Sequence, residues 1–139
     1  MIMGFTAKCF IRKSTKDLTE KLHRIGNRCG RGFWRSKINT LLVCESDQYR
    51  CLDNEWGNAV NLTEKGYINC GTNEELFLAI AALRDDSDVY QYFVNEKGMF
   101  VFCNQSELKH VIDNSEDWWD YSVSEFHKAT VAELIEHFK

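Results

Sequence analysis

The feature that most constrains this fold is a capped amphipathic helix followed by a β-hairpin. Thr72 and Glu75 have the spacing of a capping box, and the apolar residues that follow them recur at helical intervals. Two β-rich runs, 89–94 and 99–103, then flank the turn sequence 95–98, which is typical of a hairpin. The middle of the chain therefore contains both a helix and an antiparallel strand pair.

Similar signals predict the other elements. We expect strands over 5–12, 38–44 and 121–126, and one or two short strands between residues 49 and 68 around a turn at 53–58. We expect one helix after a cap formed by Ser14 and Asp17, and a short one over 106–112. A capping box of Thr130 and Glu133 begins the last helix, whose inward-facing residues are predicted to be Val131, Leu134, Ile135 and Phe138.

The order of these elements favours an α+β fold. Strands that pair in hairpins, without strict alternation with helices, predict an antiparallel or mixed β-sheet with about three helices packed mainly on one face. The 139 residues suffice for one hydrophobic core, and no internal repeat or low-complexity linker interrupts them. We therefore expect a single domain over 1–139.

Composition points to a cytoplasmic protein without a cofactor. No apolar run approaches the roughly 20 residues that cross a bilayer, and residues 1–8 lack the pattern of a signal peptide. No two cysteines have CxxC spacing, so we expect reduced, buried thiols and no metal site. The six cysteines are Cys9, Cys29, Cys44, Cys51, Cys70 and Cys103.

Charge is distributed unevenly along the chain. Residues 1–37 hold ten Lys or Arg and two acids, a net charge of +8, whereas the remainder carries −12. Such asymmetry predicts a basic surface on one side of the protein and an acidic surface on the other. The alternative is that the two halves neutralise each other across the fold.

Within the basic part, the loop 26–37 combines glycine, arginine and aromatic residues. Glycines permit a close approach of backbone to ligand, arginines bind phosphate or carboxylate, and aromatic rings stack on bases. It is not a P-loop, because no Lys-Ser or Lys-Thr follows the glycines. The alternative is a flexible connection with solvated arginines. The predicted ligand-binding residues are Arg28, Arg31, Phe33, Trp34 and Arg35.

The acidic part contains a second candidate surface, in the segment 113–121. Its carboxylates favour solvent, which makes it difficult to bury all the aromatic rings between them. Exposed Trp and Tyr are common anchors of protein interfaces, so Trp118, Trp119 and Tyr121 are predicted to bind a partner. In the alternative interpretation, the two tryptophans cap the core while the acids face outward.

No catalytic residue is predicted. The histidines His23, His110, His127 and His137 show neither HxH nor HExxH spacing, and no nucleophile elbow is present. A Cys-His pair that meets only in space stays open.

Three segments carry a resemblance to known proteins. Residues 4–13 (GFTAKCFIRK), 70–86 (CGTNEELFLAIAALRDD) and 126–138 (FHKATVAELIEHF) resemble those of short proteins from gut bacteria, their phages and mobile elements. No activity is established for that group. The resemblance implies a context in which small accessory proteins often bind or inhibit host systems.

Together these features predict a non-enzymatic binding protein of phage or mobile-element type. It would bind or inhibit a host protein, for example in a counter-defence role, or it would sequester a small anionic ligand. One alternative is a nucleotide or nucleic-acid binder that uses loop 26–37, although the net charge of −4 predicts weak nucleic-acid binding at most. Another is a small Cys/His-dependent hydrolase. We expect no membrane partner, and the sequence leaves a homo-oligomer open.

Overall fold

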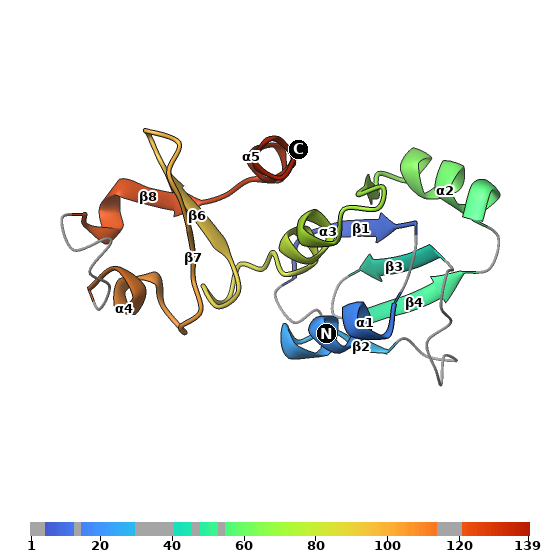
Figure 1. Ribbon diagram of the computed structural model, residues 1–139, viewed down its shortest axis with the longest axis horizontal. Coiled ribbons are helices and arrows are strands. Elements are labelled where there is room, and N and C mark those ends of the chain that lie inside the picture. The colour runs from blue at the N-terminus through green and yellow to red at the C-terminus, as the bar shows by residue number, and fades with distance from the viewer. Residues whose placement is uncertain (1–4, 13–14, 30–40, 46–47, 53–54, 114–120) are drawn as a thin grey trace.

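The computed structural model describes residues 5–12, 15–29, 41–45, 48–52, 55–113 and 121–139. Of residues 28–29, 50–52 and 55–59 it describes the backbone alone. This part of the chain forms two β-sheets with helices packed around them, arranged as two adjoining parts (Figure 1). The predicted α+β class is confirmed, and the strands are divided between a mixed sheet and an antiparallel one.

The larger sheet is mixed and has the strand order β2-β4-β3-β1-β5. Its strands are β1 (Lys8–Ile11), β2 (Arg28–Cys29), β3 (Leu41–Glu45), β4 (Gln48–Leu52) and β5 (Ile68–Asn69). β3 pairs antiparallel with both β1 and β4, whereas β5 runs parallel to β1 and β2 parallel to β4. Three helices accompany this sheet: α1 (Lys16–Arg24), α2 (Glu55–Glu64) and α3 (Glu74–Ala81).

Each face of the larger sheet carries its own core, because successive side chains of a strand point to opposite sides. Cys9 and Ile11 of β1 are fully buried in the main core, which α1 and α3 also enter. Phe10, between them, is fully buried in a smaller core with Leu62 of α2 and Tyr67. α1 and α3 therefore cover one face, and Leu62 of α2 packs against the other.

The smaller sheet is antiparallel, with the strand order β7-β6-β8. Its strands are β6 (Tyr92–Asn95), β7 (Phe100–Phe102) and β8 (Phe126–Lys128), and the helices of this part are α4 (Leu108–Asp113), the 3₁₀ turn η1 (Val123–Glu125) and α5 (Val131–His137). The predicted hairpin is confirmed. Its turn depends on Gly98, whose φ of +78° strains any L side chain, and on the Asn95 side chain, which accepts from the amides of Lys97 and Met99.

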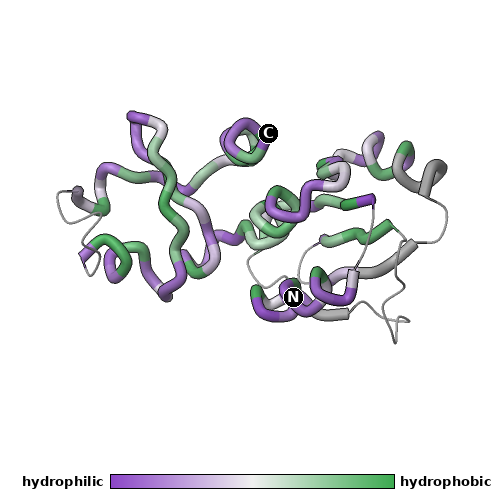
Figure 2. The backbone as a smooth tube through the Cα atoms, in the orientation of Figure 1, coloured by the Kyte–Doolittle hydropathy of each residue, from purple (hydrophilic) through white to green (hydrophobic). Residues whose placement is uncertain are grey.

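The two sheets share the main core. Val94 of β6, Ala129 after β8 and Leu134 of α5 belong to the same buried cluster as the residues of α1 and α3. Figure 2 shows hydrophobic residues along β1, β3 and α3 and again along β6, the segments that form the buried centre of each part. Burial of apolar surface thus holds the second sheet against α3.

The connection between the sheets is fixed by two long side chains. The carboxamide of Gln91 is buried, donates to the carbonyls of Ala82 and Val89, and accepts from the amide of Arg84. Lys128 of β8 donates to the carbonyl of Arg84 at 2.6 Å and to that of Ser87 at 3.0 Å. Buried polar groups need such partners, so the segment between α3 and β6 is anchored to the end of α3 and to β8.

The helix ends follow the predicted chemistry with two corrections. The capping box of Thr130 and Glu133 is confirmed. α3 is capped by Asn73, whose side chain accepts from the Leu76 amide, and not by the predicted Thr72, which is exposed. Asn is among the strongest N-cap residues, which explains this choice. Thr15 caps α1 in the same way, whereas the predicted Ser14 lies outside the described residues. Among the helices described, none is long and apolar enough to cross a membrane.

Three further predictions were wrong, the first of them in part. Between residues 49 and 68 the expected strands are present, as β4 and the start of β5, but helix α2 begins at Glu55, inside the predicted turn, because burial of Leu62 outweighs the turn-like local sequence. The strand expected over 121–126 begins only at Phe126, after the 3₁₀ turn, where the Glu125 carboxylate accepts from the Ser122 amide at 2.6 Å. Ile135 is 39% exposed and does not face inward.

Candidate ligand cleft

The basic loop predicted from the sequence lies mostly outside the described residues. Arg31, Phe33, Trp34 and Arg35 fall there, and Arg28 is described only as backbone, in β2. β2 lies at one end of the larger sheet, and among the described strands it pairs with β4.

The start of that loop is anchored in the core by Asn27. Its buried side chain donates to the carbonyl of Ala81 at 3.5 Å and accepts from the thiol of Cys44 at 3.1 Å. Gly26, with a φ of +102°, ends α1, and a Cβ built on it would lie 3.5 Å from the Arg84 guanidinium. The C-terminal end of α1 therefore lies beside the C-terminal end of α3.

Of the predicted partner surface, the structure describes one aromatic residue. Trp118 and Trp119 lie outside the described residues. Tyr121 is half-buried, donates from its hydroxyl to the sulfur of Met99 at 3.4 Å, and meets the ring of Phe126 edge to face at 6.1 Å. Tyr121 thus packs against the second sheet and exposes only part of its ring.

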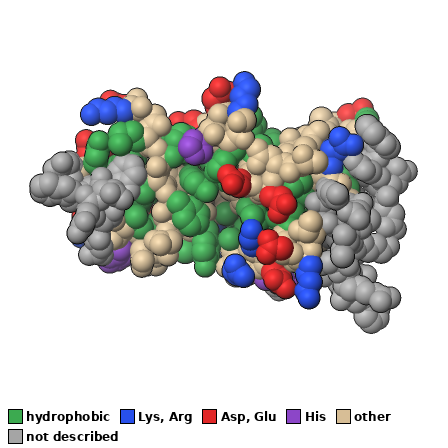
Figure 3. All heavy atoms as spheres, in the orientation of Figure 1, with side chains coloured by type: hydrophobic (Ala, Val, Ile, Leu, Met, Phe, Trp, Pro, Cys, Tyr) green, Lys and Arg blue, Asp and Glu red, His purple; other side chains and the backbone are tan. Residues whose placement is uncertain are grey.

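A cleft that the sequence did not predict opens between α1, α3 and the second sheet, with a volume of about 250 Å³. Its helical walls come from residues three or four apart, which lie on one helix face. The wall residues are Lys21, Arg24 and Ile25 of α1 and Glu75, Leu78, Ala79 and Ala82, which run along α3. Figure 3 shows hydrophobic side chains gathered in the middle of the molecule, with acidic and basic side chains beside them.

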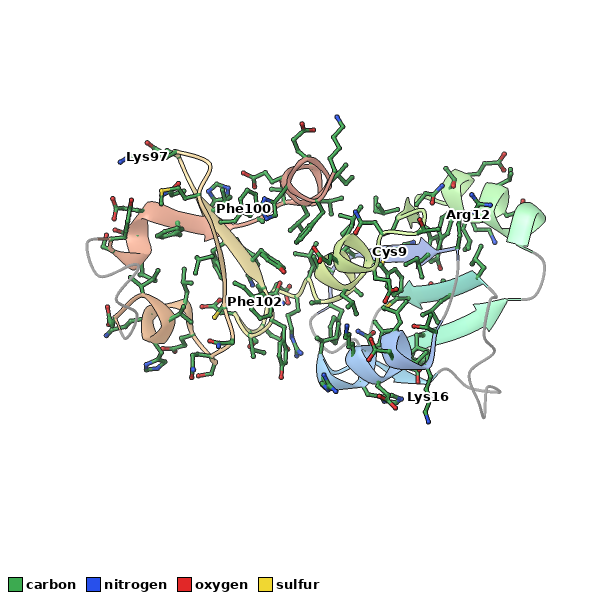
Figure 4. All side chains as sticks on the ribbon, viewed as in Figure 1. Cys9, Arg12, Lys16, Lys97, Phe100 and Phe102 are labelled. Carbon is green, nitrogen blue, oxygen red and sulfur yellow. The ribbon has the colours of Figure 1, made fainter. Side chains whose placement is uncertain are left out.

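The third wall of the cleft is aromatic. Tyr92 and Phe102, on paired strands, have ring centroids 5.0 Å apart, and Tyr90 lies 6.4 Å from Phe102. Phe102 is 43% exposed, a large value for phenylalanine, and is labelled in Figure 4 at the end of its strand. Offset and tilted rings at these distances form a favourable surface for another planar group.

The backbone of Tyr90 adopts a conformation that is rare for its residue type. Its φ is +63°, the one positive value at a non-glycine residue in the described part of the chain. Such a conformation costs on the order of 1–3 kcal/mol and persists only where neighbouring contacts impose it. Here the Tyr90 amide donates to the Cys103 carbonyl at 2.7 Å, and the next residue is the buried Gln91. In this conformation Tyr90 lines the cleft.

Charged residues border this apolar space. Lys21 and Arg24 come from the last turn of α1, where a cation interacts favourably with the helix dipole. Lys21 pairs with Asp17 at 3.0 Å, whereas Arg24 makes no ion pair with any described residue. Glu75 is in the first turn of α3. Burial, and then the charge of Glu75, raise the pKa of Tyr92, so this phenol stays protonated at neutral pH.

The described cysteines are buried thiols. Cys9, Cys44, Cys70 and Cys103 form no disulfide, and each thiol donates to a carbonyl or amide oxygen. Burial raises the pKa of Cys9 well above its usual value, with further contributions from Cys70 and Cys44, and burial also raises the pKa of Cys103. A protonated thiol is the less reactive form.

We therefore expect these four cysteines to resist alkylation in the native protein. Treatment with N-ethylmaleimide followed by peptide mass spectrometry should leave them unmodified, whereas the same treatment in denaturant should modify all four. A reductant should leave the melting temperature unchanged, because the four described cysteines form no disulfide that it could break. Rapid native modification, or a fall of many degrees in reductant, would contradict this picture.

The described histidines lie on the surface. The Nε2 atom of His23 lies 2.6 Å from the Tyr49 hydroxyl, and that of His127 lies 2.9 Å from the Glu133 carboxylate. His137 stacks on Phe100 with the ring centroids 3.9 Å apart. His110 lies near Glu107 at 3.6 Å. No group of three His, Cys, Asp or Glu residues suited to a metal ion occurs among the residues described.

Sequence reasoning missed the cleft because three distant segments form it. Lys21 and Arg24 belong to the basic part of the chain, but nothing in the local sequence connects them with Phe102. The sequence does contain one signal of the cleft, the helical spacing of Glu75, Leu78, Ala79 and Ala82. This spacing indicates one helix face that is apolar and ends in an acid.

No known protein family matches this sequence, and neither a curated protein nor a solved structure shows significant similarity to it.

Proposed function

We propose that this protein binds a small anionic ligand with a planar apolar body, in the cleft between α1, α3 and the second sheet. The observation that supports this proposal is the combination of an aromatic wall with two basic side chains, Lys21 and Arg24, at one cleft. Binding sites for small molecules are mostly apolar, with a few polar groups that fix orientation.

The size of the cleft limits the ligand. About 250 Å³ lies below the ~300 Å³ at which sites for drug-sized molecules begin, which favours a single ring or a fused pair. A carboxylate or phosphate on such a ring would meet Arg24, whose planar guanidinium binds both groups with two parallel hydrogen bonds. The ring itself would lie against Tyr90, Tyr92 and Phe102.

The side chains around the cleft supply shape and charge. Its described lining combines aliphatic, aromatic, Lys, Arg and Glu side chains, and the described thiols are directed into the core instead. This composition supports a protein that holds its ligand without transforming it. Two cations from the basic N-terminal part of the chain, Lys21 and Arg24, border the cleft and would interact with the ligand there.

The probe 4-methylbenzoate tests this function. In amide NMR titrations we expect it to shift signals of the cleft walls, Tyr90 and Tyr92 among them. Arg24→Ala should weaken its affinity about tenfold or more, because hydrogen bonds to a charged group contribute roughly 1.5–3 kcal/mol. Phe102→Ala should weaken it as well, through the lost aromatic contact.

The matched control is Lys16→Ala, which removes an exposed cation from the same helix away from the cleft. It should bind the probe like the wild type, and the neutral isostere 4-methylbenzamide should bind more weakly than the acid. Equal losses of affinity in Arg24→Ala and Lys16→Ala would show that the effect comes from the net charge of the protein and not from Arg24 at the cleft. Signal shifts away from the cleft would place the site elsewhere.

A further inference from the structure

The two ends of the cleft carry opposite charges. Asn27 contacts the carbonyl of Ala81, so the end of α1, with Arg24, lies beside the C-terminal end of α3. Glu75 is in the first turn of α3, at the other end of the same helix face. From Glu75 to Ala82 the helix rises by roughly 10 Å, at about 1.5 Å per residue.

The aromatic wall follows the same direction. Tyr90 adjoins Gln91, which binds the Ala82 carbonyl, so this ring belongs to the Arg24 end. Tyr92 lies at the Glu75 end: its ring meets that of Phe138 at 5.2 Å between centroids, and the Phe138 carbonyl accepts from Asn73, the N-cap of α3. Phe102 contacts both tyrosine rings and lies between the two ends.

These opposite charges do not neutralise each other. Among the described residues, neither Arg24 nor Glu75 forms an ion pair, although each lines the cleft. Two exposed charges at the ends of an apolar channel favour a guest that carries the complementary charges at its own ends. A purely anionic guest would leave its far end facing the Glu75 carboxylate.

We infer that the cleft selects a ligand with an anionic group at one end, an aromatic ring in the middle and a cationic amine at the other end. This inference rests on the proposed function and adds the amine to it. Arg24 binds the anion, Tyr92 and Phe102 contact the ring, and Glu75 accepts hydrogen bonds from the ammonium. A guest whose two charges share one carbon cannot reach both ends.

Three probes that differ by one group test the inference. They are 4-methylbenzoate, which has the anion alone, 4-methylbenzylamine, which has the cation alone, and 4-(aminomethyl)benzoate, which has both. We expect the third to bind the wild type about tenfold or more tightly than the first, because it adds a charge-assisted contact. Its meta isomer, 3-(aminomethyl)benzoate, should lose most of that gain.

Glu75→Gln removes the charge and keeps the shape. We expect it to abolish the advantage of 4-(aminomethyl)benzoate while leaving the affinity for 4-methylbenzoate equal or higher. Glu74→Gln is the matched control, since Glu74 is an exposed neighbour in the same turn that does not line the cleft. It should retain the wild-type preference.

The outcomes separate this inference from the proposed function. Equal affinity of the wild type for 4-methylbenzoate and 4-(aminomethyl)benzoate would contradict recognition of the amine but would leave the proposed anion site unaffected. An advantage that survives in Glu75→Gln would overturn the role of Glu75. If neither carboxylate-bearing probe binds, both the inference and the proposed function fail.

Discussion

Replacing Leu134 by alanine is expected to lower the free energy of unfolding by about 2–5 kcal/mol, the usual range for a leucine lost from a well-packed core. Leu134 is 1% exposed and belongs to the core that α3 shares with Val94 and Ala129. Its removal leaves a cavity where α5 meets α3. Urea denaturation measured by circular dichroism gives the change directly.

Ile135→Ala is the matched control, on the same helix and one residue further. Ile135 is 39% exposed, so its truncation should cost well under half as much. The pair also tests the expectation of a single domain. If the shared core makes the two sheets one cooperative unit, calorimetric and van't Hoff enthalpies should agree in the wild type. Two separate transitions, with only one moved by Leu134→Ala, would show that the sheets unfold independently.

Local signals were sufficient for the elements whose own sequence dictates their structure. The hairpin of β6 and β7 combines β-rich runs with a turn that requires Gly98, and α5 has a full capping box. In these segments the hydrogen bonds that define the element connect residues close in the chain. Tertiary structure then adds burial without changing the type of element.

Elements defined by distant contacts were not predictable in the same way. α2 depends on Leu62 reaching the core formed by Phe10, Leu41 and Val43, and its local sequence resembles a turn. The second sheet depends on β8 pairing with β6, which places Phe93 opposite Lys128. Neither contact leaves a periodic pattern in the sequence, so the division into two sheets emerged only from the structure.

The candidate site illustrates the same limit. The sequence drew attention to dense local motifs, such as the loop 26–37 and the segment 113–121. The cleft instead combines ordinary residues from three segments, and its most unusual feature is the strained backbone of Tyr90. Backbone strain is a property of the folded chain, because it persists only where contacts from other segments impose it. Strained residues also cluster at functional sites.

The contacts that impose this strain centre on Gln91. The variant Gln91→Leu is expected to have a free energy of unfolding that is lower by roughly 3 kcal/mol or more. Leucine has a similar volume but forms no side-chain hydrogen bonds, so the carbonyls of Ala82 and Val89 lose the donor that Gln91 supplies. Each buried polar group left without a partner costs about 1–3 kcal/mol. Chemical denaturation measures the loss.

Gln105→Leu is the control for this variant, because Gln105 is an exposed glutamine whose change should stay within about 0.5 kcal/mol of the wild type. Since Gln91 links the end of α3 to β6, its loss should also loosen the cleft. Hydrogen exchange of the Tyr90 amide, which donates to the Cys103 carbonyl, should therefore accelerate in Gln91→Leu relative to the global unfolding rate. Unchanged stability together with unchanged exchange at Tyr90 would mean that the carboxamide is dispensable and that packing alone holds the two sheets at the cleft.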